Sequence, residues 1–97
     1  MMKYMVIETF KPGMTDQVYE RFRAKGRMLP VGLVYIDSWL SRDRTRCFQL
    51  MAADRPEVLD AWMGKWQDLV DFEIVPVQNS PSQTGAAAAR PHDPVFS

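Results

Sequence analysis

The sequence predicts a single α+β domain in which two helices cover one face of a four-stranded antiparallel sheet. Three observations lead to this fold class. Four stretches alternate apolar side chains with a period of two, which is typical of strands. Two other stretches repeat apolar residues every three or four positions, which is typical of amphipathic helices. Turn-forming residues separate these segments in the order strand, helix, strand, strand, helix, strand.

The chain begins with a strand and a helix. Residues 3–10 alternate along a strand that ends at the turn sequence Lys11-Pro12-Gly13. Apolar residues then recur at helical spacing, and we expect a helix over residues 15–28. Pro30 and Gly32 end this helix and precede the next strand.

The middle of the chain predicts a β-hairpin over residues 32–53, with a polar turn at residues 41–45. The sequence Asp54-Arg55-Pro56-Glu57 is typical of a helix start, and a second helix is expected over residues 56–68. Residues 70–78 alternate again as a fourth strand. This order is the split βαβ arrangement of the ferredoxin-like fold.

Strand alternation assigns each side chain to one of two sheet faces. We expect the more aliphatic face to pack against the helices, because helix stripes that include Trp62 and Trp66 need apolar partners. This face contains Met5, Ile7, Val34, Ile36, Phe48, Leu50, Phe72 and Ile74. The opposite face then contains Tyr4, Val6, Glu8, Phe10, Leu33, Tyr35, Asp37, Trp39, Cys47, Gln49, Met51, Glu73, Val75 and Val77.

That second face is too apolar to remain in water on a monomer. We therefore expect a homodimer formed through the open sheet face, in which two sheets make a barrel with the helices outside. Each half of this dimeric α/β barrel would contain a lined cavity, and a small molecule in that cavity is the other partner we expect.

The composition fits one soluble domain. The chain has 97 residues, of which 46% are apolar, and this is enough for a hydrophobic core. Twelve basic residues balance twelve acidic ones, so neither nucleic acid nor an anionic membrane is favoured as a partner. No stretch resembles a membrane span or a secretory signal, and the single Cys47 suits a reducing compartment. We expect a cytoplasmic protein.

The composition changes after Asn79. Residues 80–97 are rich in Ser, Pro, Gly and Ala and show no apolar period, which predicts a flexible C-terminal tail. The folded domain is therefore expected to span residues 1–79.

His92 is the only histidine, and it lies in this tail. A serine triad, a histidine-ligated zinc site and a histidine-activated Cys47 nucleophile all lack their histidine in the predicted domain. No glycine-rich phosphate loop follows a strand. We expect no metal and no cofactor.

Carboxylates on the predicted cavity face are the candidates for chemistry. Asp37 and Glu8 are the predicted catalytic residues, because a carboxylate held among aromatic rings in a partly dry cavity can transfer protons near neutral pH. Asp37 is the first choice, since it lies between Tyr35 and Trp39. The alternative is that these carboxylates form ion pairs with nearby arginines or lie at the wet rim of the dimer interface.

Six further residues on this face are expected to contact a ligand: Tyr35, Trp39, Gln49, Cys47, Met51 and Glu73. Aromatic rings stack on planar ligands, and Gln49 supplies both a donor and an acceptor to orient one. The alternative is that the aromatic residues only fill the dimer core.

The first predicted helix carries four basic residues, Arg21, Arg23, Lys25 and Arg27. Their spacing spreads charge around the helix, so we interpret them as a solvated surface with a carboxylate partner at Asp16 or Glu20.

Five blocks of sequence resemble a known family. They are MKYMVIE-FKPG, YERFR-KGRMLP, GL-YIDSW, RCFQLM and W-DLVDFEIVPV, and together they cover Lys3 to Val77. They resemble an uncharacterised bacterial domain-of-unknown-function family in the dimeric α/β-barrel superfamily. The resemblance implies the fold and no activity. Relatives in that superfamily include cofactor-free monooxygenases, muconolactone isomerases and haem enzymes, and haem is disfavoured here because the domain has no axial histidine.

Three functions remain open from the sequence, and enzymatic activity is left undecided. The first is binding of a small apolar or aromatic molecule in the cavity. The second is a cofactor-independent monooxygenase or isomerase that uses Asp37 or Glu8 as general base. The third is a structural dimerisation module without a ligand.

Overall fold

The computed structural model describes residues 1–80, which form four strands and two helices in the predicted order. The strands are β1 (Met2–Phe10), β2 (Leu33–Leu40), β3 (Arg46–Ala53) and β4 (Val70–Val77), and the helices are α1 (Thr15–Lys25) and α2 (Glu57–Met63). The predicted tail lies outside the described residues except for Ser80, so the domain boundary at residue 79 stays a prediction.

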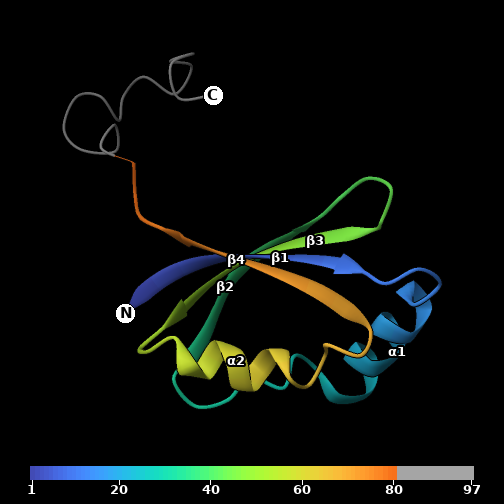
Figure 1. Cartoon of the computed structure of the whole chain (residues 1–97), viewed down its shortest axis with the longest axis horizontal. Helices are drawn as coiled ribbons and strands as arrows, with labels where there is room; N and C mark the ends of the chain where they lie inside the picture. The colour runs from blue at the N-terminus through green and yellow to red at the C-terminus, as the bar shows by residue number, and fades with distance from the viewer. Residues whose placement is uncertain (81–97) are drawn as a thin grey trace.

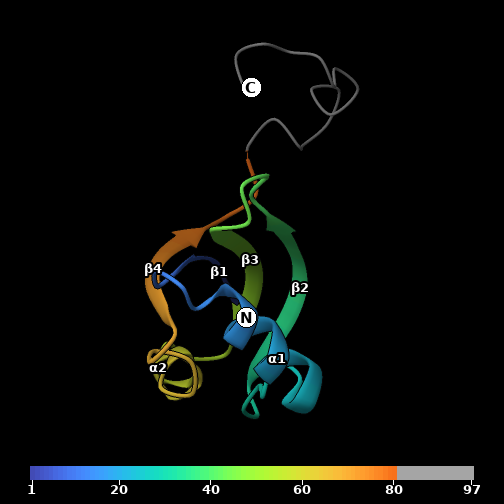
Figure 2. The same ribbon diagram turned by 90° about the vertical axis from the view of Figure 1, so that its right-hand side faces the viewer.

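The strands form one antiparallel sheet in the order β2-β3-β1-β4. Both helices lie against the same face of this sheet (Figure 1). The sheet curves over the helices, so that β4 and β2 descend on either side of them (Figure 2). This arrangement confirms the predicted ferredoxin-like fold. We call the face toward the helices the inner face and the opposite one the outer face.

Both helices end earlier than the sequence predicts. Gly26 follows α1 with a φ of 66°, which only glycine adopts without strain, and its N–H donates to the carbonyl oxygen of Phe22 at 2.8 Å. Helix α2 ends at Met63, and successive turns carry the chain from Gly64 to the start of β4.

The hairpin turn lies where the sequence predicts it, and Asp43 holds it. One carboxylate oxygen of Asp43 accepts hydrogen bonds from the Ser41 hydroxyl at 2.7 Å and from the Thr45 hydroxyl and backbone N–H at 2.7 and 3.1 Å. These bonds lower the pKa of Asp43 to about 2, because they favour the charged carboxylate. Arg44, at the tip, has a φ of 63°.

The predicted assignment of sheet faces was wrong for β1, for β3 and for the first half of β2. Tyr4, Val6, Glu8 and Phe10 are buried on the inner face, with Val6 fully inaccessible. The other inner-face residues of the predicted open face are Leu33, Tyr35, Cys47, Gln49 and Met51. Strand β4 has the predicted orientation, with Phe72 and Ile74 packed against the core. Both faces of the sheet are rich in apolar residues, so the alternation identifies which side chains share a face but not which face the helices cover.

A β-bulge in β2 explains why its two halves differ. Tyr35 pairs with Met51, but the next pair joins Asp37 to Leu50, so Ile36 is an extra residue in the ladder. The bulge shifts the alternation by one position. Tyr35 therefore lies on the inner face, whereas Asp37 and Trp39 lie on the outer face.

Trp62 in α2 and Trp66 in the turns that follow α2 fix the segment that joins α1 to β2. The indole N–H groups of Trp62 and Trp66 both donate to the carbonyl oxygen of Arg27, at 2.9 and 3.2 Å. The Lys65 ammonium donates to the carbonyl oxygen of Met28 at 3.2 Å. Both tryptophans are buried, which confirms their predicted place in the core.

An ion pair joins α1 to the turn before β4. The Arg21 guanidinium donates to both carboxylate oxygens of Asp68, at 2.8 and 2.7 Å, and lies 5.5 Å from the ring centre of Trp66. The predicted partner of Arg21 on its own helix, Asp16 or Glu20, was therefore wrong.

The outer face is not covered by any described segment and remains apolar. Val34 is 47% exposed and Trp39 is 50% exposed, and Ile36 and Val75 are also exposed. Neither helix in residues 1–80 is long and apolar enough to cross a membrane.

Candidate functional site

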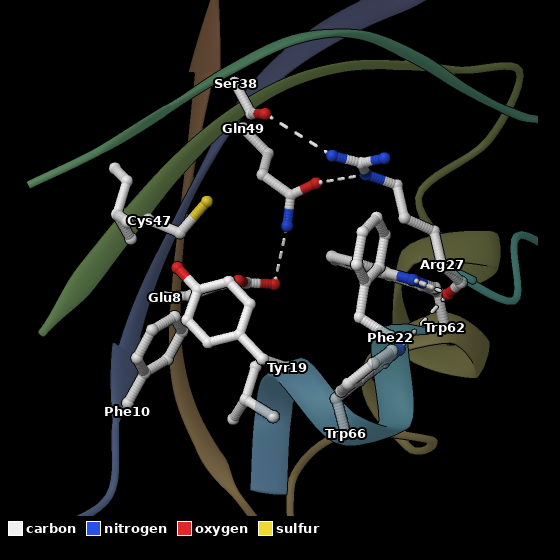
Figure 3. A pocket seen from close by; sticks show the side chains of 12 residues that line it. Glu8, Phe10, Tyr19, Phe22, Arg27, Ser38, Cys47, Gln49, Trp62 and Trp66 are labelled. Atoms are coloured by element: carbon white, nitrogen blue, oxygen red, sulfur yellow. Dashed lines mark hydrogen bonds between the residues drawn. The ribbon is translucent and has the colours of Figure 1, made fainter. Parts of the chain in front are cut away.

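A cavity of about 270 Å³ lies between the inner face of the sheet and the helical layer. Most of its lining side chains are aromatic or aliphatic, and a small polar group lies at its centre (Figure 3). The lining residues are Glu8, Phe10, Val18, Tyr19, Phe22, Arg27, Ser38, Leu40, Cys47, Gln49, Trp62 and Trp66.

The polar group is a chain of three side chains from different parts of the fold. The Gln49 amide nitrogen donates to Glu8 Oε2 at 2.7 Å, and Gln49 Oε1 accepts from Arg27 Nε at 3.0 Å. Glu8 lies near the end of β1 and Gln49 in the middle of β3, while Arg27 follows α1. In Figure 3, Gln49 separates Glu8 from the guanidinium.

Arg27 fixes which way the Gln49 amide points. A guanidinium can only donate hydrogen bonds, so the Gln49 atom that faces Arg27 must be the oxygen. The amide nitrogen is then directed at Glu8, where it donates. Arg27 therefore donates to Gln49, and Gln49 in turn donates to the carboxyl group of Glu8.

Aromatic rings surround the Arg27 guanidinium. Its central carbon lies 3.7 Å from the ring centre of Tyr35 and 5.0 Å from that of Phe22. Nη2 makes a longer contact of 3.4 Å with the Ser38 hydroxyl, which in turn lies 2.7 Å from the Tyr35 hydroxyl. These contacts hold a cation at the edge of an apolar cavity.

Glu8 is the buried ionisable group of the site. Its residue is 6% exposed, and this burial raises the pKa of the carboxyl from 4.5 to about 7. The hydrogen bond from Gln49 and the charge of Arg27 oppose the shift without cancelling it. Oε1 accepts no hydrogen bond from any residue in the described part of the chain. Glu8 therefore has an oxygen that accepts no hydrogen bond from residues 1–80, and its raised pKa favours the protonated carboxyl.

Cys47 lies beside Glu8 across the β1–β3 ladder. Burial, and then the nearby charge of Glu8, raise the pKa of its thiol to about 11. The thiol stays protonated at neutral pH, so its contribution to the cavity is steric and weakly polar.

The structure divides the predicted site residues between two faces. Glu8, Gln49 and Cys47 line the cavity, and the ring of Tyr35 packs against the Arg27 guanidinium on the same face. Met51 is also on the inner face but is fully buried in the core, away from the cavity lining.

Asp37, Trp39 and Glu73 lie on the outer face, which is the open face on which the sequence placed them, and take no part in this cavity. Their predicted place in a cavity between two subunits stays a prediction. The bulge at Ile36 separates Asp37 and Trp39 from Tyr35, which was predicted on the same face and lies on the inner one. The carboxylate of Asp37 instead accepts a hydrogen bond from the backbone N–H of Ser38 at 2.8 Å.

Sequence reasoning missed Arg27, Tyr19, Phe22 and Ser38. Arg27 was interpreted as one of four solvated charges, but α1 ends at Lys25 and leaves Arg27 in the connecting segment. The sequence does carry one signal of this change, because Gly26 precedes Arg27 and is a common residue at helix ends.

Within residues 1–80 no group of three or more His, Cys, Asp or Glu side chains is placed to hold a metal ion. Glu8 is the one carboxylate among the residues that line the cavity.

The fold and the site define a small α+β domain with an aromatic cavity and a buried carboxyl group. The chain belongs to the family described as a domain of unknown function, DUF3303, which matches residues 2–91. A search of curated proteins found no match. The family assignment agrees with the resemblance seen in the sequence at the level of an uncharacterised family; a bacterial origin and the dimeric-barrel superfamily stay predictions.

The raised pKa of Glu8 predicts how stability depends on pH. Unfolded Glu8 loses its proton near pH 4.5, whereas folded Glu8 keeps it to about pH 7, so the unfolded state binds fewer protons between these values. The free energy of unfolding should therefore fall as pH rises through this window, by up to about 3 kcal/mol in total. Glu8→Gln should remove this part of the slope in urea denaturation measured from pH 4 to 8.

Glu20→Gln is the matched control for that experiment, because Glu20 is an exposed glutamate on α1. It should keep the slope of the unchanged protein. Equal slopes for Glu8→Gln and the unchanged protein would contradict the burial of an ionisable carboxyl at this position.

Proposed function

We propose that the protein binds a small, planar and largely apolar molecule in the cavity between the sheet and the helices. The observation that carries this proposal is an aromatic cavity of about 270 Å³ with a few converging polar groups. Binding sites for small molecules commonly have this composition. The volume exceeds the roughly 150 Å³ of an apolar cavity that takes up benzene.

The lining favours a flat ligand. Phe10, Tyr19 and Phe22 contribute rings to the cavity lining, and Phe10 and Tyr19 meet edge-on with ring centres 6.2 Å apart. Glu8 Oε1 is a hydrogen-bond acceptor when ionised and a donor when protonated, so it can orient a ligand that carries a hydroxyl or carbonyl group.

Filling the cavity should abolish binding. Cys47→Phe places a ring on the inner face of β3, whereas Leu50→Phe places the same ring on the outer face. A library of one- and two-ring aromatic compounds should quench or shift the fluorescence of Trp62 and Trp66, which line the cavity. Cys47→Phe should weaken any such binding by about tenfold or more, which corresponds to about 1.4 kcal/mol.

Leu50→Phe should bind the same compounds as the unchanged protein. Equal affinity of Cys47→Phe and Leu50→Phe would move the binding site away from the cavity, and the absence of any binding compound would contradict the proposed function.

A second candidate is proton transfer by Glu8, and the pKa of about 7 favours it. A general base works best when its pKa is close to the operating pH. Glu8 would remove a proton from one atom of the ligand as the ionised carboxylate and return it to another atom, so an isomerisation needs no further reactant. A cofactor-free oxygenation would begin with the same deprotonation and would consume molecular oxygen.

If turnover of a bound compound is detected, its rate should identify the base. The value of kcat/KM should rise with pH to a plateau, with a midpoint near 7, because the ionised carboxylate is the active form. Glu8→Gln should lower it by about 10²–10⁴-fold. Asp37→Asn is the control on the outer face and should leave it unchanged; the reverse result would return the role of base to Asp37.

A homodimer through the outer face is also proposed, with a second copy of this chain as the partner. Exposed apolar side chains on β2 and β4 support it, among them Val34, Trp39 and Val75. The same face carries Arg46 as well as the acidic Asp71 and Glu73, so a second copy related by a twofold axis can offer charges of opposite sign. Trp39 and Val75 were expected on this open face from the sequence, whereas Val34 was expected to face the helices.

The oligomeric state tests the homodimer. The unchanged protein should be a dimer at micromolar concentration by native mass spectrometry, and Val34→Asp should dissociate it, because the substitution places a charge in the apolar interface. Val31→Asp is the matched control, since Val31 is 97% exposed in the loop before β2. A monomeric unchanged protein, or dissociation by both variants alike, would contradict this interface.

A further inference from the structure

Arg27 is a cation without a carboxylate partner in the described part of the chain. The one ion pair found among residues 1–80 joins Arg21 to Asp68. The side chain of Arg27 donates instead to two neutral acceptors, the amide of Gln49 and the hydroxyl of Ser38. Glu8 is the nearest acid in the cavity lining, and the Gln49 amide lies between the two groups.

The guanidinium has donors left for a ligand. It carries five N–H groups, and the two contacts above use one on Nε and one on Nη2. Nη1 has no acceptor among residues 1–80, and the contact of Nη2 with Ser38 is long, at 3.4 Å. The paired N–H groups of Nη1 and Nη2 form the fork that binds a carboxylate through two parallel hydrogen bonds.

The position of this fork is held by the backbone. Trp62 and Trp66 bind the carbonyl oxygen of Arg27, and the rings of Tyr35 and Phe22 flank its guanidinium. A preorganised cation loses little conformational entropy when an anion binds. The planar guanidinium of Arg27 also stacks on these rings, so an aromatic ligand in the cavity would meet the cation beside aromatic side chains.

A second arginine lies near the cavity. Arg44, in the turn between β2 and β3, lies 5.2 Å from the ring centre of Tyr19, which lines the cavity. Arg44 has no ion-pair partner in residues 1–80. The aromatic cavity is therefore flanked by two unpaired arginines, which favours entry of a negatively charged ligand.

We infer that the ligand of this cavity is a small aromatic carboxylate, whose ring lies among the aromatic side chains and whose carboxylate binds the fork of Arg27. This inference rests on the proposed binding function and specifies the class of molecule. The charge-assisted bonds to Arg27 replace its contact with Ser38, and the free oxygen of Glu8 faces the ring and its substituents.

Matched pairs of compounds test the inference directly. Benzoate and benzamide have nearly the same shape and differ in charge, as do 2-naphthoate and 2-naphthamide. Titration of tryptophan fluorescence should show that each acid binds about tenfold or more tightly than its amide, as expected for hydrogen bonds to a charged group. Arg27→Met should abolish this preference and leave the affinity for the amides largely unchanged.

Arg23→Met is the control variant, because Arg23 is an exposed residue of α1 that loses the same charge. It should keep the preference for acids. Arg27→Met retains the backbone carbonyl that Trp62 and Trp66 bind, and Arg27→Gln provides a second neutral variant if the first does not fold. The comparison of acid with amide on the unchanged protein requires no variant.

The outcomes separate this inference from the function on which it rests. Equal binding of acids and amides, or a preference that survives loss of the Arg27 charge, would overturn the inference and leave the cavity as a neutral binding site. Binding of uncharged indole or naphthalene, with no binding of benzoate or 2-naphthoate, would also overturn the inference. No binding by any of these compounds would overturn both.

Discussion

Two indole N–H groups converge on one carbonyl oxygen, and the geometry of the cavity depends on this contact. Trp62 and Trp66 hold the backbone of Arg27 against the second helical region, just after a glycine has ended α1. Arg27 then orients the Gln49 amide, because a guanidinium can only donate, and Gln49 directs its own donor at Glu8. A core contact thus determines the arrangement of polar groups around a buried carboxyl.

The energetics of that carboxyl connect stability to function. Burial of Glu8 disfavours its charged form more than the Gln49 hydrogen bond and the Arg27 charge favour it. Above neutral pH the protein is therefore less stable than it would be with a neutral residue at position 8. Ionisable groups with strongly shifted pKa values are concentrated at functional sites, although structural groups also show such shifts. Cys47, beside it, is also shifted toward its neutral form. Both groups are thus shifted toward their neutral forms, with the cationic Arg27 at the edge of the cavity.

The sequence was sufficient for the order of elements and for the turn at residues 41–45, because apolar period and turn residues depend on local chemistry. It was not sufficient to predict which face of the sheet the helices cover. Both faces are apolar, and one extra residue at Ile36 separates Tyr35 from Asp37. Glu8, Gln49 and Cys47 were predicted on one face because side chains alternate along strands, whereas the place of Arg27 depends on where α1 ends and on a contact with distant tryptophans.

The central claim is that Glu8 is a buried carboxyl group that titrates near neutrality. The most direct measurement is an NMR titration of the side-chain carboxyl carbons in protein labelled with ¹³C at glutamate, with Glu8→Gln used to assign the Glu8 resonance. A midpoint near pH 7 for that resonance is the predicted result. A midpoint near 4.5 would show that water solvates Glu8 freely, and it would contradict the burial of this carboxyl on which the site depends.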